Sequence, residues 1–144
     1  MLICMCGVAG SGKSTKAKEL AKWYNAVIVS TDAIREELFG DASIQKNNKK
    51  VFEIAFARVA EALQNGKAVI FDATNLTIKD RAKVLEIGEK WNRGFNVIYV
   101  MTASIDECKK RNSERERKVP DTAIEKQFKK YTAPTRAEGW DIIR

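Results

Sequence analysis

Three short stretches of the sequence carry residue types that handle phosphates and protons. The stretch "GVAGSGKS" (7–14) places glycines around a Lys-Ser pair, "STDAIR" contains Asp32 and Arg35, and "VIFDATN" contains Asp72. A glycine-rich turn lets backbone N–H groups surround an anion, and a lysine and a hydroxyl beside it suit phosphates and their metal ion. Carboxylates are the side chains left for proton transfer near neutral pH, because the chain contains no histidine.

The first stretch is a complete phosphate-binding loop (P-loop) of the form Gly-x4-Gly-Lys-Ser, with an apolar run before it and a helical pattern after it. This spacing predicts that Lys13 reaches the β- and γ-phosphates of a nucleotide and that the Ser14 hydroxyl ligates Mg²⁺. ATP or another nucleoside triphosphate is therefore the expected ligand. With two arginines from farther along the chain, the predicted nucleotide-binding residues are Gly7, Gly10, Ser11, Gly12, Lys13, Ser14, Thr15, Arg111 and Arg115.

Asp32 directly follows a predicted strand, at the strand end where open α/β sheets place their active sites. Its carboxylate would accept a proton from an incoming hydroxyl, or it would only cap the helix that follows; the spacing leaves both roles open. Arg35 is three residues farther on and shares a helix face with Asp32. A carboxylate beside a guanidinium favours an acceptor that has both a hydroxyl and a negative charge.

Asp72 ends another buried apolar run, where P-loop proteins often keep a carboxylate that supports Mg²⁺ through water. The alternative is that Asp72 only ends the strand and caps a turn. Thr74 and Asn75 follow in the loop over the same edge of the sheet. They complete the predicted acceptor-binding set with Asp32 and Arg35.

A basic cluster supplies the last candidates, since six of the ten residues 109–118 are Lys or Arg. Arg111 and Arg115 are one helical turn apart and are expected to share a face. Such a run is usually a solvated surface with weak ion pairs. In a nucleotide kinase, however, an arginine-bearing lid, here residues 109–119, closes on the phosphates. The spacing alone does not decide between these two interpretations.

The elements that position these residues alternate along the chain and predict one α/β domain over residues 1–144. Strands separated by helices indicate a mainly parallel sheet with helices on both faces. Strands are expected at 2–6, 26–30, 68–72 and 95–101 and at the C-terminal "WDIIR", with helices after the P-loop, from Asp32, over 51–64, over 77–91, from Ser104 and from Pro120.

Charge and cysteine usage narrow the function classes. With 26 Lys and Arg against 19 Asp and Glu, the net charge is +7, which favours an anionic partner such as nucleic acid, although solubility alone also explains a modest surplus. The Cys4-Met5-Cys6 sequence indicates a buried strand in a reducing compartment rather than a metal site. No apolar run approaches the ~18 residues of a membrane span and no leader is evident, so a cytoplasmic protein without a membrane partner is expected.

The motifs "GSGKST", "TDAIR", "DATNL", "RNSERERKVP" and "QFKKYTAPTRAEGWDII" together resemble the polynucleotide 5′-kinase family, in order over nearly the whole chain. The resemblance implies a nucleoside-monophosphate-kinase-like fold and Mg²⁺-dependent transfer of the ATP γ-phosphate to a 5′-hydroxyl end of RNA or DNA. It implies that Lys13 and Ser14 hold phosphates and metal and that Asp32 is the general base. It also implies that Arg35 contacts the phosphate 3′ to the terminal acceptor nucleotide and that Arg115 contacts the donor phosphates.

The chain departs from this family at two points. The bacteriophage member has its acidic residue directly before Thr-Asn, where this chain has Ala73, so that Asp72 is the nearest acid. No motif for the accompanying phosphatase is present, so a phosphatase or ligase would be supplied separately; a free-standing kinase and a domain of a larger end-repair protein both fit. The alternatives are a small-metabolite kinase for an acceptor such as gluconate or shikimate, and a nucleotide-binding regulator that hydrolyses ATP slowly.

Overall fold

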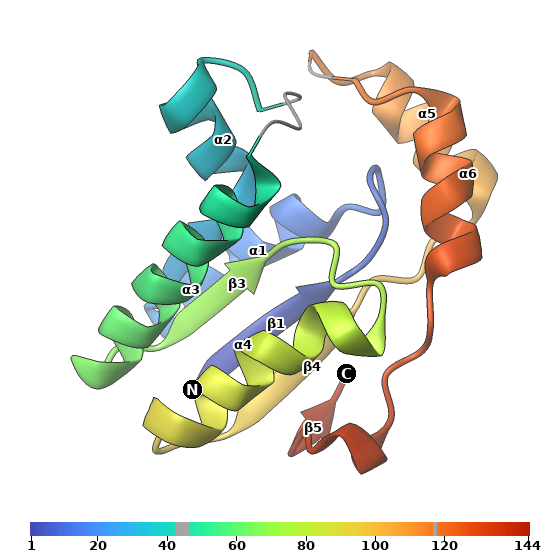
Figure 1. Cartoon of the computed structure of the whole chain (residues 1–144). Helices are drawn as coiled ribbons and strands as arrows, with labels where there is room; N and C mark the ends of the chain where they lie inside the picture. The colour runs from blue at the N-terminus through green and yellow to red at the C-terminus, as the bar shows by residue number, and fades with distance from the viewer. Residues whose placement is uncertain (43–46, 117) are drawn as a thin grey trace.

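The apolar runs of the sequence form one parallel sheet, and the stretches between them form the helices that cover it (Figure 1). The computed structural model describes residues 1–42, 47–116 and 118–144. The elements follow in the order β1 (Leu2–Cys6), α1 (Lys13–Tyr24), β2 (Val27–Ser30), α2 (Thr31–Phe39), α3 (Asn48–Gln64), β3 (Val69–Asp72), α4 (Ile78–Trp91), β4 (Asn96–Val100), α5 (Ile105–Ser113), α6 (Asp121–Lys130), the 3₁₀ helix η1 (Arg136–Glu138) and β5 (Ile142–Ile143).

The strand order explains where a ligand can bind. The five-stranded sheet has the order β2-β3-β1-β4-β5, and all its strand pairs are parallel. The loop after β1 leads to α1 on one face, whereas the loop after β3 leads to α4 on the other face (Figure 1). In open α/β sheets, neighbouring strands that diverge in this way leave a crevice at their carboxyl ends. The α/β, P-loop-type fold predicted from the sequence is confirmed.

Each face of the sheet has its own apolar layer. Leu2, Cys4 and Cys6 of β1 pack in the cluster that includes α3 and α4, whereas Ile3 and Met5 point to the opposite side, where α1 lies. Burial raises the pKa of the Cys6 thiol to about 11. It also raises the pKa of the Cys4 thiol well above its ordinary value, so both thiols stay protonated near neutral pH. The buried-strand interpretation of Cys4-Met5-Cys6 is confirmed.

Several boundaries follow the predicted signals. The Thr77 hydroxyl accepts a hydrogen bond from the Asp80 backbone N–H at the start of α4, and Ser104 does the same for Glu107 at the start of α5. Pro120 precedes α6 directly. The sequence patterns did not predict the 3₁₀ helix η1, a single turn with no amphipathic period. Among the described helices, none is long and apolar enough to span a membrane.

Candidate active site

The phosphate-binding loop depends on two glycines with left-handed backbone conformations. Gly10 has φ 79° and Gly12, the N-cap of α1, has φ 87°. A Cβ at Gly10 would also clash with the backbone carbonyl of Cys108, so α5 packs directly on the loop. This conformation directs the N-terminus of α1 into the crevice, where its dipole and its free N–H groups favour an anion.

Asp72, the last residue of β3, joins the two P-loop side chains. Its Oδ1 accepts a hydrogen bond from Lys13 Nζ at 2.8 Å, and its Oδ2 accepts one from the Ser14 hydroxyl at 2.9 Å. A hydroxyl and a carboxylate side by side form the hard-oxygen donor set that Mg²⁺ prefers. The two side chains therefore fit the expected metal ion.

Asp32 and Arg35 lie on one face of α2, as predicted. Arg35 Nη1 donates to Asp32 Oδ1 at 3.0 Å, and Arg35 Nη2 donates to the side chain of Asn48 at the start of α3. The Asp32 side chain is 42% exposed, whereas that of Arg35 is only 9% exposed. The hydroxyl of Ser30 caps α2 by accepting from the Ala33 N–H, so Asp32 is not the capping residue.

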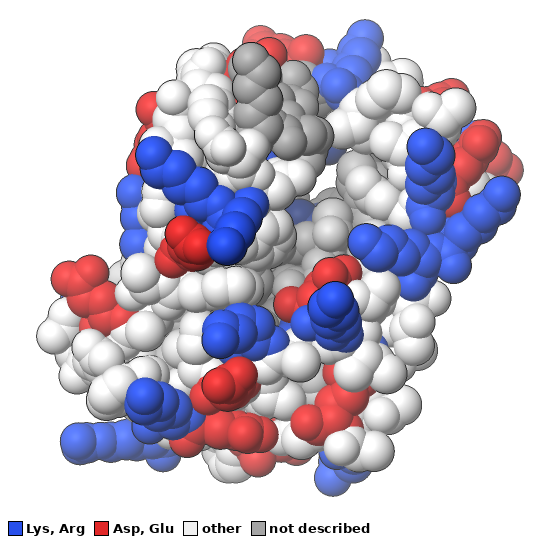
Figure 2. Space-filling model, in the orientation of Figure 1, with Lys and Arg blue, Asp and Glu red and all other residues white. Residues whose placement is uncertain are grey.

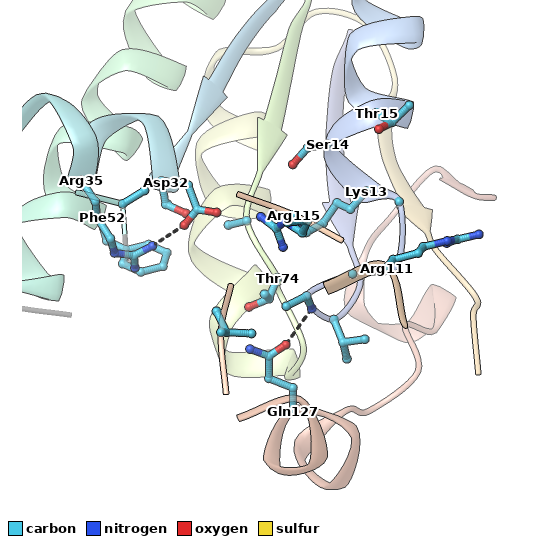
Figure 3. A pocket seen from close by; sticks show the side chains of 18 residues that line it. Lys13, Ser14, Thr15, Asp32, Arg35, Phe52, Thr74, Arg111, Arg115 and Gln127 are labelled. Atoms are coloured by element: carbon cyan, nitrogen blue, oxygen red, sulfur yellow. Dashed lines mark hydrogen bonds and ion pairs between the residues drawn. The ribbon is translucent and has the colours of Figure 1, made fainter. Parts of the chain in front are cut away.

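These groups surround one pocket of about 460 Å³ at the carboxyl ends of the strands. Figure 2 shows a hollow in the molecular surface, and Figure 3 shows the pocket itself, with Asp32 and Arg35 across the space from Lys13 and Ser14. The residues predicted from the sequence that line it are Gly10, Gly12, Lys13, Ser14, Thr15, Asp32, Arg35, Thr74, Arg111 and Arg115. Asp72 reaches it through its contacts with Lys13 and Ser14.

Asn75, which was predicted to bind the acceptor, does not line the pocket. It is 3% exposed and has φ 48°, and its Nδ2 donates to the backbone carbonyl of Met5 at 2.7 Å. The side chain therefore ties the loop after β3 to β1 and does not line the pocket. Two predicted nucleotide-binding positions lie behind the lining: the Ser11 side chain is buried, and Gly7 donates its N–H to the carbonyl of Thr74.

The prediction that Arg111 and Arg115 share a helix face is wrong. Helix α5 ends at Ser113, and Arg115 lies in the turn beyond it. Both arginines nevertheless line the pocket. Arg117, also in the predicted lid of 109–119, lies outside the described residues.

Two of the pocket residues that the sequence patterns did not predict come from helices far from the P-loop in the sequence. Phe52 of α3 and Gln127 of α6 line the space, and the Gln127 Oε1 accepts a hydrogen bond from the backbone N–H of Ala9 in the P-loop at 2.8 Å (Figure 3). Neither residue stands in a recognisable motif, and both reach the pocket only because separate helices converge on it. The amphipathic pattern of α6, with Ile124 and Phe128 facing inward, would have placed Gln127 beside them but not on the P-loop.

A buried ion pair beneath the site was also missed. Arg81 of α4 is fully buried and donates to both carboxylate oxygens of Glu138, at 2.6 and 2.9 Å, and to the carbonyl of Asn75. Burial alone would raise the pKa of Glu138, but hydrogen bonds and charge from Arg81, with the Thr135 N–H, hold that pKa below its usual value. The pair connects η1 to the loop after β3.

Nothing within the described ranges gathers three or more Cys, Asp or Glu side chains into a metal-binding group. The Ser14 and Asp72 pair is a different arrangement, because in such sites phosphates and water supply most of the ligands of Mg²⁺. The site can therefore bind a nucleotide triphosphate with its metal and can present a carboxylate and arginines to a second substrate.

Known proteins share this architecture. The L-seryl-tRNA(Sec) kinase of Methanococcus maripaludis is 30% identical over 149 residues, which cover 99% of this chain and 56% of that protein. The chain spans about half the length of the curated relatives it matches. A chain in the structure of the Pnkp1/Rnl/Hen1 RNA repair complex superposes with a TM-score of 0.79 at 26% identity, covering 90% of this chain and 43% of that one.

More distant structures share the fold alone. Kti12 of Chaetomium thermophilum in complex with ADP-AlF3 has a TM-score of 0.77 at 18% identity, covering 100% of this chain and 88% of that one. A gluconokinase of Sinorhizobium meliloti 1021 has a TM-score of 0.67 at 20% identity, covering 98% and 79%. The fold by itself therefore does not identify the acceptor. The family model described as "AAA domain" matches residues 2–134, and with the P-loop geometry above, the chain belongs to this AAA domain family as a P-loop protein of the kinase type.

Proposed function

We propose that this protein is a polynucleotide 5′-hydroxyl kinase that transfers the γ-phosphate of ATP to the 5′-OH end of RNA or DNA. The whole chain, residues 1–144, would act as one kinase domain, with the segment 109–119 as its arginine-bearing lid. The proposal rests on the family resemblance of the motifs, on the geometry of one pocket and on the net charge of +7.

The single observation that carries the proposal is the Asp32–Arg35 pair opposite the P-loop. Among the described residues, the buried Nε of Arg35 has no hydrogen-bond partner, although the other two guanidinium nitrogens are bonded. Buried N–H groups are nearly always paired in native proteins, and Arg35 lines the pocket, so the unpaired Nε supports an anionic ligand beside this guanidinium. An acceptor with a phosphate beside its hydroxyl would supply that anion, and Asp32 would receive the proton of the hydroxyl.

In the proposed reaction, Lys13 and the backbone N–H groups of the P-loop hold the donor phosphates. Ser14 and Asp72 would hold Mg²⁺, which supplies charge neutralisation of the phosphates. Asp32 accepts the proton as the acceptor oxygen attacks the γ-phosphorus in line with the leaving ADP oxygen. Arg115 and Arg111 stabilise the negative charge on the transferring group from the lid side.

A second candidate acceptor is an RNA-linked serine hydroxyl. The relative that is 30% identical over nearly the whole chain is named for phosphorylating seryl-tRNA. Asp32 and Arg35 suit this acceptor on the same grounds, since it also combines a hydroxyl with nearby phosphates. Small metabolites such as gluconate and a regulatory role without an acceptor have weaker support: a regulator needs no base, and the gluconokinase similarity extends to the fold alone.

The deciding experiment incubates the protein and Mg²⁺ with γ-labelled ATP and one acceptor at a time: a 5′-hydroxyl oligonucleotide, seryl-tRNA, gluconate, shikimate or water. Label on the oligonucleotide 5′ end supports the proposal. Label on seryl-tRNA alone supports the second candidate acceptor instead. Release of free phosphate at the same rate with and without every acceptor would contradict both.

A further inference from the structure

A hydrogen bond joins α6 to the phosphate-binding loop and takes no direct part in the proposed chemistry. The Oε1 of Gln127 accepts from the backbone N–H of Ala9 at 2.8 Å. The other arm of the amide, Nε2, has no hydrogen bond to the described part of the chain. In Figure 3 the oxygen of the Gln127 amide is turned toward the P-loop and the nitrogen away from it.

The helix that carries Gln127 is joined to the helix that leads to the lid arginines. Lys109 of α5 pairs with Glu125 of α6 at 2.7 Å. The Asn112 side chain accepts from the Val119 N–H at 3.0 Å and donates to the Val119 carbonyl at 2.6 Å. These contacts fasten both ends of the segment that contains Arg115, so the position of α6 sets the position of this arginine. We call α5, α6 and the described residues between them the α5–α6 unit.

The α5–α6 unit meets the P-loop through packing and through one hydrogen bond. Val8 packs in one cluster with Cys108 and Ile124, and Gly10 lies against the carbonyl of Cys108. These contacts fix a distance but little direction. At Ala9 the contact is a directional hydrogen bond from a backbone N–H to the amide oxygen of Gln127, and this bond limits how the unit can rotate about the loop.

The chemistry of glutamine suits this place. The Ala9 N–H needs an acceptor, which a lysine or an arginine cannot provide. A carboxylate would provide one, but it would add negative charge to a pocket built for phosphates. A neutral amide oxygen satisfies the N–H without opposing the nucleotide.

We propose that Gln127 is a positioning residue that seats the α5–α6 unit on the P-loop, so that Arg115 reaches the transferring phosphoryl group. This inference rests on the proposed kinase function for its rate measurements only. Gln127 acts through Arg115, and its loss affects the transition state more than the binding of ATP.

The kinetic test compares Gln127→Met, which keeps length and removes the acceptor, with Lys126→Met at the exposed neighbouring position of the same helix. Gln127→Met should lower kcat by up to ~10²-fold, the cost of a small misplacement of a catalytic group, while the dissociation constant for ATP stays unchanged. In an Arg115→Ala background the same substitution should cost nothing further, because both changes remove one contribution. Losses that multiply, or equal effects of the two methionine variants, would overturn the proposal.

A second arm needs no acceptor and therefore distinguishes failure of this inference from failure of the proposed function. Saturating Mg²⁺ and a non-hydrolysable ATP analogue should protect the lysines and arginines of 109–118 from trypsin in the wild-type protein and in Lys126→Met, but not in Gln127→Met. Gln127→Glu, which retains an oxygen for the Ala9 N–H, should restore the protection at a higher concentration of the analogue, because its charge opposes the phosphates. Equal protection in Gln127→Met and the wild-type protein would refute the seating role, whichever acceptor the enzyme uses.

Discussion

At the scale of single residues, the proposed function assigns different parts of acceptor recognition to Asp32 and Arg35. The half-exposed carboxylate can meet a hydroxyl that arrives from solvent, whereas the buried guanidinium is held in place by Asp32 and Asn48. A planar guanidinium held at two of its nitrogens presents its remaining N–H groups in fixed directions. The first two predictions separate the proton-accepting role from the phosphate-binding role.

Asp32→Asn should lower kcat by ~10²–10⁴-fold, because the amide keeps the shape of the carboxylate but cannot accept the proton. ATP affinity, measured by equilibrium binding, should stay the same, since the P-loop is intact. The matched control is Asp80→Asn, an exposed carboxylate in the first turn of α4 as Asp32 is in the first turn of α2. Asp80→Asn should leave kcat unchanged. Activity of Asp32→Asn within a few-fold of wild type would remove Asp32 from the mechanism.

Arg35→Ala should affect only acceptors that carry a phosphate. A nucleoside 3′-monophosphate should be a workable minimal acceptor and the bare nucleoside a poor one, because losing a desolvated charged contact costs ~2–5 kcal/mol. That loss corresponds to roughly 30- to several-thousand-fold in kcat/KM. The loss in kcat/KM from the substitution and the loss from removing the 3′-phosphate should not multiply, since each change removes half of one contact. Measuring kcat/KM for both proteins on both acceptors tests this.

The control for that comparison is Arg58→Ala, since Arg58 pairs with Glu37 on the exposed surface of α3. An Arg35→Ala variant that harms both acceptors equally would show that Arg35 only orients Asp32. A wild-type enzyme indifferent to the 3′-phosphate would count against a polynucleotide acceptor.

At the scale of elements, the 3₁₀ helix η1 is connected through α4 to the loop after β3, which borders the site. Glu138 of η1 binds Arg81 of α4, Arg81 binds the carbonyl of Asn75, and the neighbouring Thr74 carbonyl accepts the N–H of Gly7. A continuous series of contacts therefore runs from η1 to the first glycine of the P-loop. Because the pair is buried, removing one partner leaves an uncompensated charge in the interior.

Glu138→Ala should reduce the free energy of unfolding by about 3–5 kcal/mol at neutral pH. Glu37→Ala, which breaks an exposed pair, should cost far less. The folded state lowers the pKa of Glu138 below its ordinary value of 4.5. Its stabilisation is therefore complete above that value and is lost as the pH falls from there through the lower folded-state pKa. Urea unfolding should show the Glu138→Ala deficit shrinking in this acid window; a deficit independent of pH would contradict the charged-pair account.

The elements also show what the sequence could and could not predict. Regular periodicity predicted the strands and long helices, and the P-loop spacing predicted Lys13 and Ser14 at the nucleotide pocket, because these are local or motif-encoded patterns. The sequence placed Asn75 beside the acceptor because it follows β3 in the loop over the site. Its left-handed conformation turns the side chain toward β1 instead, away from the pocket lining. The contact of Gln127 with Ala9 and the Arg81–Glu138 pair could not be predicted from the sequence. Both join segments far apart in the chain, and no motif marks either partner.

At the scale of the whole molecule, the net charge of +7 favours a polyanionic partner. Asn48 contacts Arg35 and Phe52 lines the pocket, so the start of α3 lies at the border of the pocket. Lys49 and Lys50 are exposed at this end of α3. Lys46, a third lysine nearby in the sequence, lies outside the described residues. Under the proposed function, Lys49 and Lys50 would contact phosphates of the acceptor strand beyond its first nucleotide.

A polynucleotide acceptor should make the reaction strongly salt-dependent. Each single-strand phosphate neutralised by Lys or Arg releases counterions, so the logarithm of acceptor affinity should fall with the logarithm of salt concentration at about −0.7 per contact. Replacing both Lys49 and Lys50 with Ala should therefore make the slope less negative by up to ~1.4. Replacing Lys83 and Lys90 of α4 with Ala removes the same charge elsewhere and should leave the slope unchanged. Because a mononucleotide cannot reach both lysines, its salt slope should be the same in the wild-type protein and in the Lys49 and Lys50 double variant. An oligonucleotide KM that stays flat across the salt titration would instead show that the acceptor is recognised without its polyanionic strand.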